Sequence, residues 1–164
     1  MSPLVEVATG ADIAAARELQ TRIMRPNGPL PTDREPPPDW LQLVARVGDG
    51  NADGNHGAIV GAARFGPSPW PRSDLADPPS PAWQLRSVAV LPQHRGAGVG
   101  AALVNRAQSV AAANGAATLW AEARVAALSL YQRLGWFIVG PEWDKPGVGP
   151  HRFVWIPLVA EHRA

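Results

Sequence analysis

A glycine-rich turn is the part of the sequence whose residue types and spacing point most directly to chemistry. Residues Gln93–Gly100 read Gln-His-Arg-Gly-Ala-Gly-Val-Gly, between a strand-like segment, Leu85–Val90, and an alanine-rich helix, Ala101–Asn114. A turn of this kind leaves several backbone N–H groups unpaired, and the helix dipole adds partial positive charge at the same place. The turn therefore predicts a binding site for a phosphate group.

Three kinds of phosphate ligand compete for this turn. A P-loop needs a lysine and a hydroxyl residue after its last glycine, whereas Gly100 is followed by two alanines. A dinucleotide-binding unit needs its glycines after the first strand of a parallel βαβ unit, and the alternate glycines of Gly96–Gly100 are spaced more tightly than G-x-G-x-x-G. Coenzyme A is the third candidate ligand.

Two motifs give the chain a resemblance to the GNAT superfamily of N-acetyltransferases over nearly its whole length. The family's Gln/Arg-x-x-Gly-x-Gly/Ala signature is matched by Gln93–Gly98, and the longer Arg-Gly-x-Gly-x-Gly form by Arg95–Gly100. The second signature, Ala-x-x-Leu-Tyr-x-(Lys/Arg)-x-Gly-(Phe/Trp), is matched by Ala127–Trp136. Arg25–Pro29 and Gly147–His151 are similar to segments of ElaA-like acyltransferases. Two independent motifs in the right order make the family resemblance specific.

The resemblance implies where acetyl-CoA binds. The strand Leu85–Val90 is expected to splay from the strand Ala117–Ala121, so that pantetheine bonds to exposed backbone like an added strand. The pyrophosphate is expected on the N–H groups of Arg95–Gly100, where glycine allows close approach. The predicted cofactor-binding residues are Val88, Ala89, Val90, Arg95, Gly96, Ala97, Gly98, Val99 and Gly100.

The resemblance also implies catalytic roles. Tyr131, the only tyrosine, stands where the family places its general acid, although it also lies on the apolar face of its predicted helix. The general base stays open between His151, whose ordinary pKa of about 6.5 suits the task, Glu122, Glu142 and a water chain. A backbone N–H near Val90 is expected to stabilise the oxyanion. Arg124 replaces an asparagine that many members place near the cofactor.

The elements that must position these residues follow the order β-α-β-β-β-α-β-α-β-β. This order predicts an α/β fold of the α+β type, with a mixed sheet flanked by helices. The resemblance implies that this sheet is mostly antiparallel and has splayed central strands. Three loops are expected to hold acceptor specificity: Met24–Pro38, read as ordered, Gly66–Pro81, read as mobile and exposed, and Gly140–Pro150. The predicted helices are Asp12–Met24, Gly98–Asn114 and Arg124–Leu134; the predicted strands are Leu4–Ala8, Leu41–Val47, Ala58–Phe65, Trp83–Val90, Ala117–Ala121, Trp136–Val139 and Phe153–Leu158, with a hairpin loop at Gly48–Gly57.

Composition narrows the function classes. The chain has 164 residues, a formal net charge of +1 and no cysteine. This length suits one domain over residues 1–164, and the small net charge gives no electrostatic case for nucleic acid or a membrane. Without cysteine there are no disulfides and no thiol nucleophile, and no histidine pair has metal-ligand spacing, so we expect no metal. No signal or membrane-spanning pattern is present, and a cytoplasmic protein is expected.

The sequence thus predicts an acetyl-CoA-dependent N-acetyltransferase that moves an acetyl group to a primary amine of an unidentified small molecule or peptide. Direct transfer is favoured, since no cysteine can carry a covalent intermediate. A non-catalytic coenzyme-A-binding sensor or interaction module is the alternative from another class, and it needs no working Tyr131. An edge strand near the C-terminus leaves homodimer pairing open.

Overall fold

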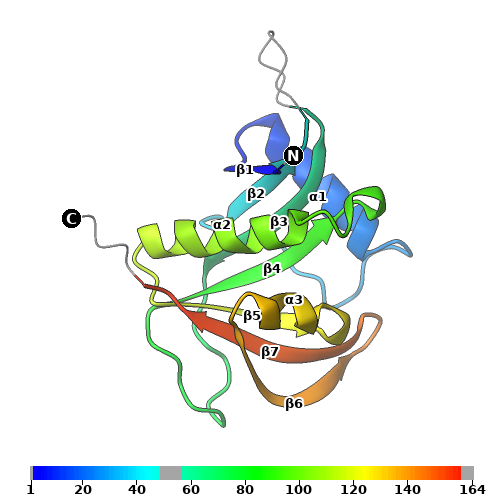
Figure 1. The fold of residues 1–164 in the computed structure, drawn as a ribbon. Coiled ribbons are helices and arrows are strands. Elements are labelled where there is room, and N and C mark those ends of the chain that lie inside the picture. The colour runs from blue at the N-terminus through cyan, green and yellow to red at the C-terminus, as the bar shows by residue number, and fades with distance from the viewer. Residues whose placement is uncertain (1, 49–56, 160–164) are drawn as a thin grey trace, which may run out of the picture. The chain divides into compact units, whose positions relative to one another are not determined.

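The elements follow the predicted order in a computed structural model that describes residues 2–48 and 57–159 (Figure 1). The predicted hairpin loop Gly48–Gly57 lies almost entirely outside the described residues. The elements are β1 (Leu4–Val7), α1 (Ala11–Met24), β2 (Leu41–Arg46), β3 (Ile59–Pro67), β4 (Ala82–Val90), the 3-10 turn η1 (Pro92–His94), α2 (Val99–Ala113), β5 (Thr118–Arg124), the 3-10 turn η2 (Val125–Ala127), α3 (Leu128–Arg133), β6 (Phe137–Lys145) and β7 (Gly149–Pro157).

Hydrogen bonds join the strands in the order β1-β2-β3-β4-β5-β7-β6. β1 with β2, β2 with β3, β5 with β7 and β6 with β7 are antiparallel, whereas β4 and β5 are parallel. The fold is therefore the expected mixed, mostly antiparallel α+β type. The described chain separates into two compact units: a first unit up to Phe65 with Ser87–Ala107, and a second unit of Gly66–Arg86 with the residues from Gln108 onward.

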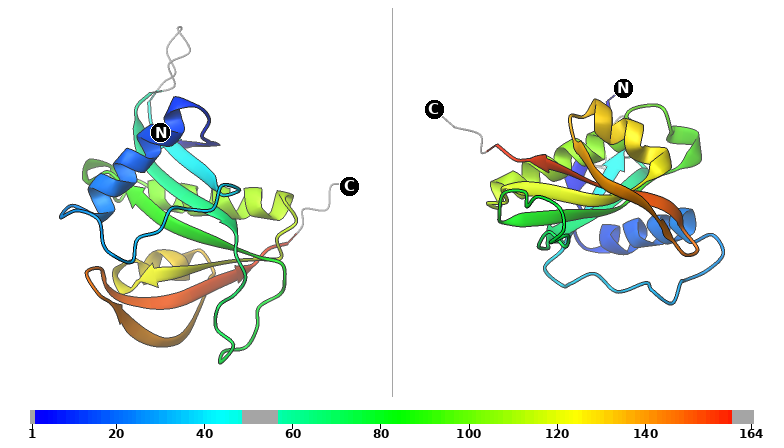
Figure 2. Two further views of the ribbon diagram at one scale, coloured as in Figure 1. Left: turned by 180° about the vertical axis from the view of Figure 1, so that it is seen from behind. Right: turned by 90° about the horizontal axis from the view of Figure 1, so that it is seen from below.

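In the first unit, helices pack on both faces of the strands. Ala16 and Leu19 of α1 join Val44, Ala62 and Ala89 in one buried apolar cluster, and α1 crosses β2 and β3 in the rear view (Figure 2, left). The neighbouring Gly61 faces α2 instead. A Cβ there would stand 2.9 Å from Val99 Cγ1 and 3.2 Å from the Ala89 carbonyl oxygen, so glycine lets the start of α2 lie against the sheet.

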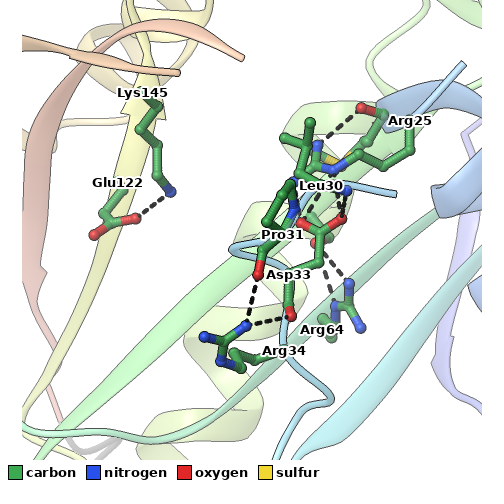
Figure 3. A network of polar contacts seen from close by, with 10 residues as sticks. Arg25, Leu30, Pro31, Asp33, Arg34, Arg64, Glu122 and Lys145 are labelled. Atoms are coloured by element: carbon green, nitrogen blue, oxygen red, sulfur yellow. Dashed lines mark hydrogen bonds and ion pairs between the residues drawn. The ribbon is translucent and has the colours of Figure 1, made fainter. Parts of the chain in front are cut away.

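The proline-rich segment after α1 is ordered, as predicted, and an ion pair between Arg25 and Asp33 helps to hold it. The Arg25 guanidinium meets the Asp33 carboxylate with Nη2 2.7 Å from Oδ1, and its Nη1 donates to the Met24 carbonyl (Figure 3). Asp33 Oδ2 also accepts the Leu30 backbone N–H at 2.8 Å. The hydrogen bonds from Arg25 and Leu30 lower the pKa of Asp33 to about 2. Arg25 thus holds this segment to the end of α1, and the Asp33 carboxylate balances its positive charge.

In the second unit, the segment between β3 and β4 is anchored rather than mobile. Trp120 Nε1 donates to the Ser68 carbonyl and Thr118 Oγ1 to the Pro79 carbonyl. The Trp70 ring makes edge contacts with Trp120 and Phe153, at centroid distances of 5.8 and 5.4 Å. Most residues of this segment are exposed, as expected, and these contacts with β5 and β7 hold it in place.

Strand pairing corrects several predicted boundaries. β5 and β7 pair along their full length, from Thr118↔Pro157 to Arg124↔His151. This pairing extends β5 to Arg124 and shortens the predicted helix Arg124–Leu134 to η2 and α3, because ladder hydrogen bonds override local helix propensity. The predicted loop Gly140–Pro150 is mostly the β6–β7 hairpin (Figure 2), with a register shift between Val139 and Trp143 that accommodates Gly140 and Pro141.

None of the helices in the described residues is long and apolar enough to span a membrane.

Candidate functional site

The glycine-rich turn has the backbone geometry that an anion site requires. Gly96 and Gly98 adopt φ values of +79° and +85°, which side-chain-bearing residues rarely reach. The Ala102 N–H donates to the Gly98 carbonyl at 3.0 Å, so α2 begins at once and its first N–H groups have no acceptor within the helix. Nothing lies within 4 Å of a Cβ built at either glycine. The turn therefore presents unpaired donors to open space.

Arg95 is tied to the turn by both its backbone and its side chain. Its N–H donates to the Pro92 carbonyl at 3.3 Å, and its Nε donates to the Val90 carbonyl at 3.2 Å. Since the Arg95 N–H already has an acceptor, we expect the backbone N–H groups from Gly96 onward to bind the anion. The exposed guanidinium of Arg95 lies beside them. Arg95 also links the turn to the end of β4.

The end of β4 continues beyond its pairing with β5. The parallel register joins Ala82–Gln84 to Thr118–Trp120, and β4 then runs on to Val90. Ser87 has a φ of +56°, which redirects the strand shortly after the last registered pair. Ala89 is buried, whereas Val88 and Val90 are half-buried. The structure thus brings Val88–Val90 and Arg95–Gly100 together in the first unit.

Tyr131 lies in the second unit, near the end of α3. Its side chain is 5 % exposed and its ring meets the Trp136 ring edge-on, at a centroid distance of 4.9 Å. Burial raises the pKa of Tyr131, so its phenol keeps its proton throughout the neutral range. The helix ends at Arg133, because Gly135 adopts φ +85° and the Trp136 N–H donates to the Tyr131 carbonyl.

His151 is buried inside β7, as its third residue, rather than at a strand entrance. Its cross-strand partners are Arg124 on β5 and Trp143 on β6. Nδ1 lies 2.7 Å from the Gly149 carbonyl oxygen, which only accepts, so Nδ1 carries the proton and Nε2 presents a lone pair. Burial, aided by the charges of Lys145 and Arg124, lowers the pKa of His151. The neutral imidazole is the form a base needs.

The two glutamates suggested as bases differ in their surroundings. Glu122 Oε2 accepts a hydrogen bond from Lys145 Nζ at 2.6 Å, an ion pair with both partners partly buried (Figure 3). Glu142 is exposed on β6. The Glu122 carboxylate is thus held as the charge partner of Lys145, whereas Glu142 forms no ion pair among the described residues.

The tryptophans separate into core residues and one aromatic cluster. Trp83, Trp120 and Trp136 are buried, and Trp155 is half-buried. The Trp143 ring stacks on the Phe153 ring with 4.6 Å between ring centroids, and its centroid lies 5.8 Å from that of the His151 ring. Two arginines near the end of α1 differ in their surroundings, since Arg22 is exposed and Arg25 is paired with Asp33.

Sequence reasoning missed the residues around Ser87. The buried Gln20 donates its amide to the Ser87 carbonyl, and Arg64 donates to the Ser87 hydroxyl. One signal was available, because Gln20 stands on the apolar face of α1 with Ala16 and Leu19. In the part of the chain described, no group of three His, Cys, Asp or Glu side chains is arranged to hold a metal ion.

Sequence comparisons with known proteins relate this chain to acetyltransferases. Residues 14–136 match the model of the acetyltransferase (GNAT) family. The uncharacterized N-acetyltransferase YitI of Bacillus subtilis (strain 168) is 32% identical over 95 residues, which is 58% of this chain and 61% of YitI; the match thus spans less than two thirds of that protein.

Two solved structures share the fold. The yncA protein of Salmonella typhimurium, solved with its cofactor acetyl-CoA, has a TM-score of 0.65 and 22% identity, covering 100% of this chain and 98% of that one. Escherichia coli ElaA has a TM-score of 0.66 and 16% identity, covering 94% and 99%. With the family model matching three quarters of the residues and the motifs in place, the chain belongs to the acetyltransferase (GNAT) family.

Proposed function

We propose that this acyltransferase moves the acetyl group of acetyl-CoA to a primary amine of a small molecule or peptide, by direct transfer. The observation that carries the proposal is the turn in which two left-handed glycines, Gly96 and Gly98, lead directly into the unpaired N–H groups of α2. The family's use of acetyl-CoA and the acetyl-CoA bound to the yncA protein support the choice of donor. The pyrophosphate is assigned to this turn.

The reaction needs a neutral amine, a stabilised oxyanion and a protonated leaving group. The amine nitrogen attacks the thioester carbonyl carbon, and the carbon–sulfur bond breaks as the tetrahedral intermediate collapses. The nitrogen loses one proton and the departing thiolate gains one, so the products are an amide and free coenzyme A. Because the sequence has no cysteine, the protein has no thiol that could form a covalent acetyl-enzyme intermediate.

Tyr131 and His151 are assigned to the two proton transfers. Burial keeps the Tyr131 phenol protonated, as a general acid for the thiolate requires. His151, neutral and protonated on Nδ1, offers Nε2 as the general base for the amine. The family resemblance supports Tyr131 at this role, and the tautomer set by Gly149 supports His151.

The test removes only the phenolic oxygen. In Tyr131→Phe, kcat for acetyl-CoA-dependent thiol release should fall by about a hundredfold or more, the range for a general acid. The Kd of acetyl-CoA, measured by titration calorimetry, should stay near the parent value. Acceptors for the assay come from a screen of amino acids, polyamines, aminoglycosides and peptide N-termini.

Two results would overturn parts of this proposal. Unchanged turnover in Tyr131→Phe removes the general-acid role. Tight acetyl-CoA binding by the parent, with no acetylation of any amine class, favours a non-catalytic coenzyme-A-binding module.

A further inference from the structure

Ser87 adopts a backbone conformation that its residue type disfavours. Its φ of +56° falls in the left-handed region, which a residue with a Cβ occupies only where its surroundings impose it. It stands three residues after Gln84, the last β4 residue registered with β5. Val88–Val90 follow directly, so the direction of that backbone segment depends on the conformation at Ser87.

Two side chains from different elements hold Ser87. Gln20 of α1 donates from Nε2 to the Ser87 carbonyl oxygen at 2.9 Å. Arg64 of β3, which also appears in Figure 3, places Nε and Nη2 each 3.2 Å from the Ser87 hydroxyl oxygen. The main chain and the side chain of Ser87 are therefore both anchored, and all three residues belong to the first unit.

The hydrogen bond from Gln20 to Ser87 explains why a polar side chain occupies this buried position. The Gln20 side chain is 2 % exposed beside the apolar residues Ala16 and Leu19. Its Oε1 is buried and has no hydrogen-bond partner among the described residues. A half-satisfied buried amide destabilises a core, and an apolar residue of similar size fills such a position better. What an apolar residue cannot do is donate to the Ser87 carbonyl.

We propose that Gln20 and Arg64 are positioning residues for the acyl donor. They hold Ser87 at positive φ, and this sets the backbone of Val88–Val90 in the direction that pantetheine binds. Neither residue is assigned a contact with the acetyl group. The inference rests on the proposed function, since it takes Val88–Val90 as the pantetheine-binding segment.

The first test is Gln20→Met, which keeps the side-chain length and removes the donor. The KM and Kd of acetyl-CoA should rise about tenfold, equivalent to about 1.4 kcal/mol. In contrast, kcat at saturating acetyl-CoA and the KM of the amine should stay close to the parent values. A general loss of stability would lower the amount of active enzyme and would not raise the KM of acetyl-CoA alone.

Gln42→Met is the matched control. Gln42 is also buried in the first unit, 7 % exposed, and its Nε2 donates to the Ala63 carbonyl at 2.6 Å. The control variant loses a comparable buried amide bond without touching Ser87. Both variants should melt at lower temperature, but only Gln20→Met should raise the KM of acetyl-CoA.

Substitutions at residue 87 supply a second, independent test. Glycine occupies positive φ without strain, so in a Ser87→Gly background the added Gln20→Met change should raise the Kd of acetyl-CoA by less than about twofold. Ser87→Ala keeps the strained Cβ and loses the acceptor for Arg64, so it should weaken acetyl-CoA binding. An equal effect of Gln20→Met in the parent and in the Ser87→Gly background overturns the proposal.

Amide hydrogen exchange in the ligand-free protein tests the positioning role of Gln20 separately from the proposed acetyltransferase function. Exchange at Val88–Val90 should be faster in Gln20→Met than in Gln42→Met. If the parent binds acetyl-CoA but exchange and KM are alike in the two variants, the positioning role is wrong and the proposed function stands. If the parent fails to bind acetyl-CoA, the proposed function is overturned, and the role in donor binding with it.

Discussion

His151 is the residue whose charge state the fold decides most clearly. Its Nδ1 is committed to the Gly149 carbonyl, and burial together with Lys145 and Arg124 lowers its pKa below the ordinary value. A lowered pKa keeps the imidazole neutral over the whole range above it. If His151 is the base, activity is lost only as the pH falls through that lowered pKa.

Lys145→Met tests this assignment through the pH profile. The substitution removes a positive charge that lowers the pKa of His151 and leaves Glu122, whose charge raises it, without its ion-pair partner. The pKa of His151 should therefore rise, and the acidic limb of kcat/KM should move to higher pH with the same amine. His151→Gln should abolish that limb. An acidic limb that stays in place in Lys145→Met rules out His151 as the titrating base.

The same scale shows where residue patterns mislead. Arg25 is bound to Asp33, and Glu122, suggested as a base, is paired with Lys145. Partners eight and twenty-three residues away in the chain decided both cases. Spacing in a sequence identifies candidate charges, but only the fold shows which of them are already matched.

Helix α2 is the element to which we assign the phosphate of the acyl donor, and both its ends carry a left-handed glycine. Gly98 (φ +85°) precedes its first residue, and Gly115 (φ +88°) follows its last turn, where the Ala116 N–H donates to the Ala111 carbonyl. A Cβ at either glycine meets nothing within 4 Å. A Cβ would be strained at both positions, and only Gly98 belongs to the turn to which we assign the phosphate.

Alanine at these two glycines should separate stability from acetyl-CoA binding. Gly98→Ala and Gly115→Ala should each lower the free energy of unfolding by about 1 to 2 kcal/mol, because a Cβ is unfavourable at positive φ. Only Gly98→Ala should also weaken acetyl-CoA binding, by about tenfold or more, since it displaces N–H donors to a charged phosphate. Denaturant titration and calorimetry give the two quantities. Equal acetyl-CoA affinity in both variants contradicts the phosphate assignment.

At the scale of the whole molecule, the acyl donor should act as a stabilising ligand. A ligand at a hundred times its Kd stabilises a protein by about 2.7 kcal/mol, which for a chain of this length raises the Tm by roughly 5 to 10 °C. Acetyl-CoA and coenzyme A should both produce this shift in a thermal melt. NADH is the control, because the spacing of Gly96–Gly100 excludes a dinucleotide-binding turn. A shift with NADH and none with acetyl-CoA would reverse the choice of ligand.

The sequence by itself determined the order of the elements, the family and the glycine turn, because these rest on local properties. Positive φ requires glycine at residues 96 and 98, and the alanine-rich run that follows the turn predicts α2 without reference to the rest of the fold. The segment 140–150 was misjudged, since its glycines and prolines suggested a loop where cross-strand pairing with β7 makes a hairpin.

Only the tertiary structure decided which side chains support the turn and the strand beside it. Ser87 reads as an ordinary strand residue, and its positive φ depends on Gln20 and Arg64, sixty-seven and twenty-three residues away in the chain. Likewise, the proton on His151 Nδ1 follows from a carbonyl that β7 brings within 2.7 Å. Local conformational preference is encoded residue by residue, whereas hydrogen-bond partners are set by distances that exist only once the chain has folded.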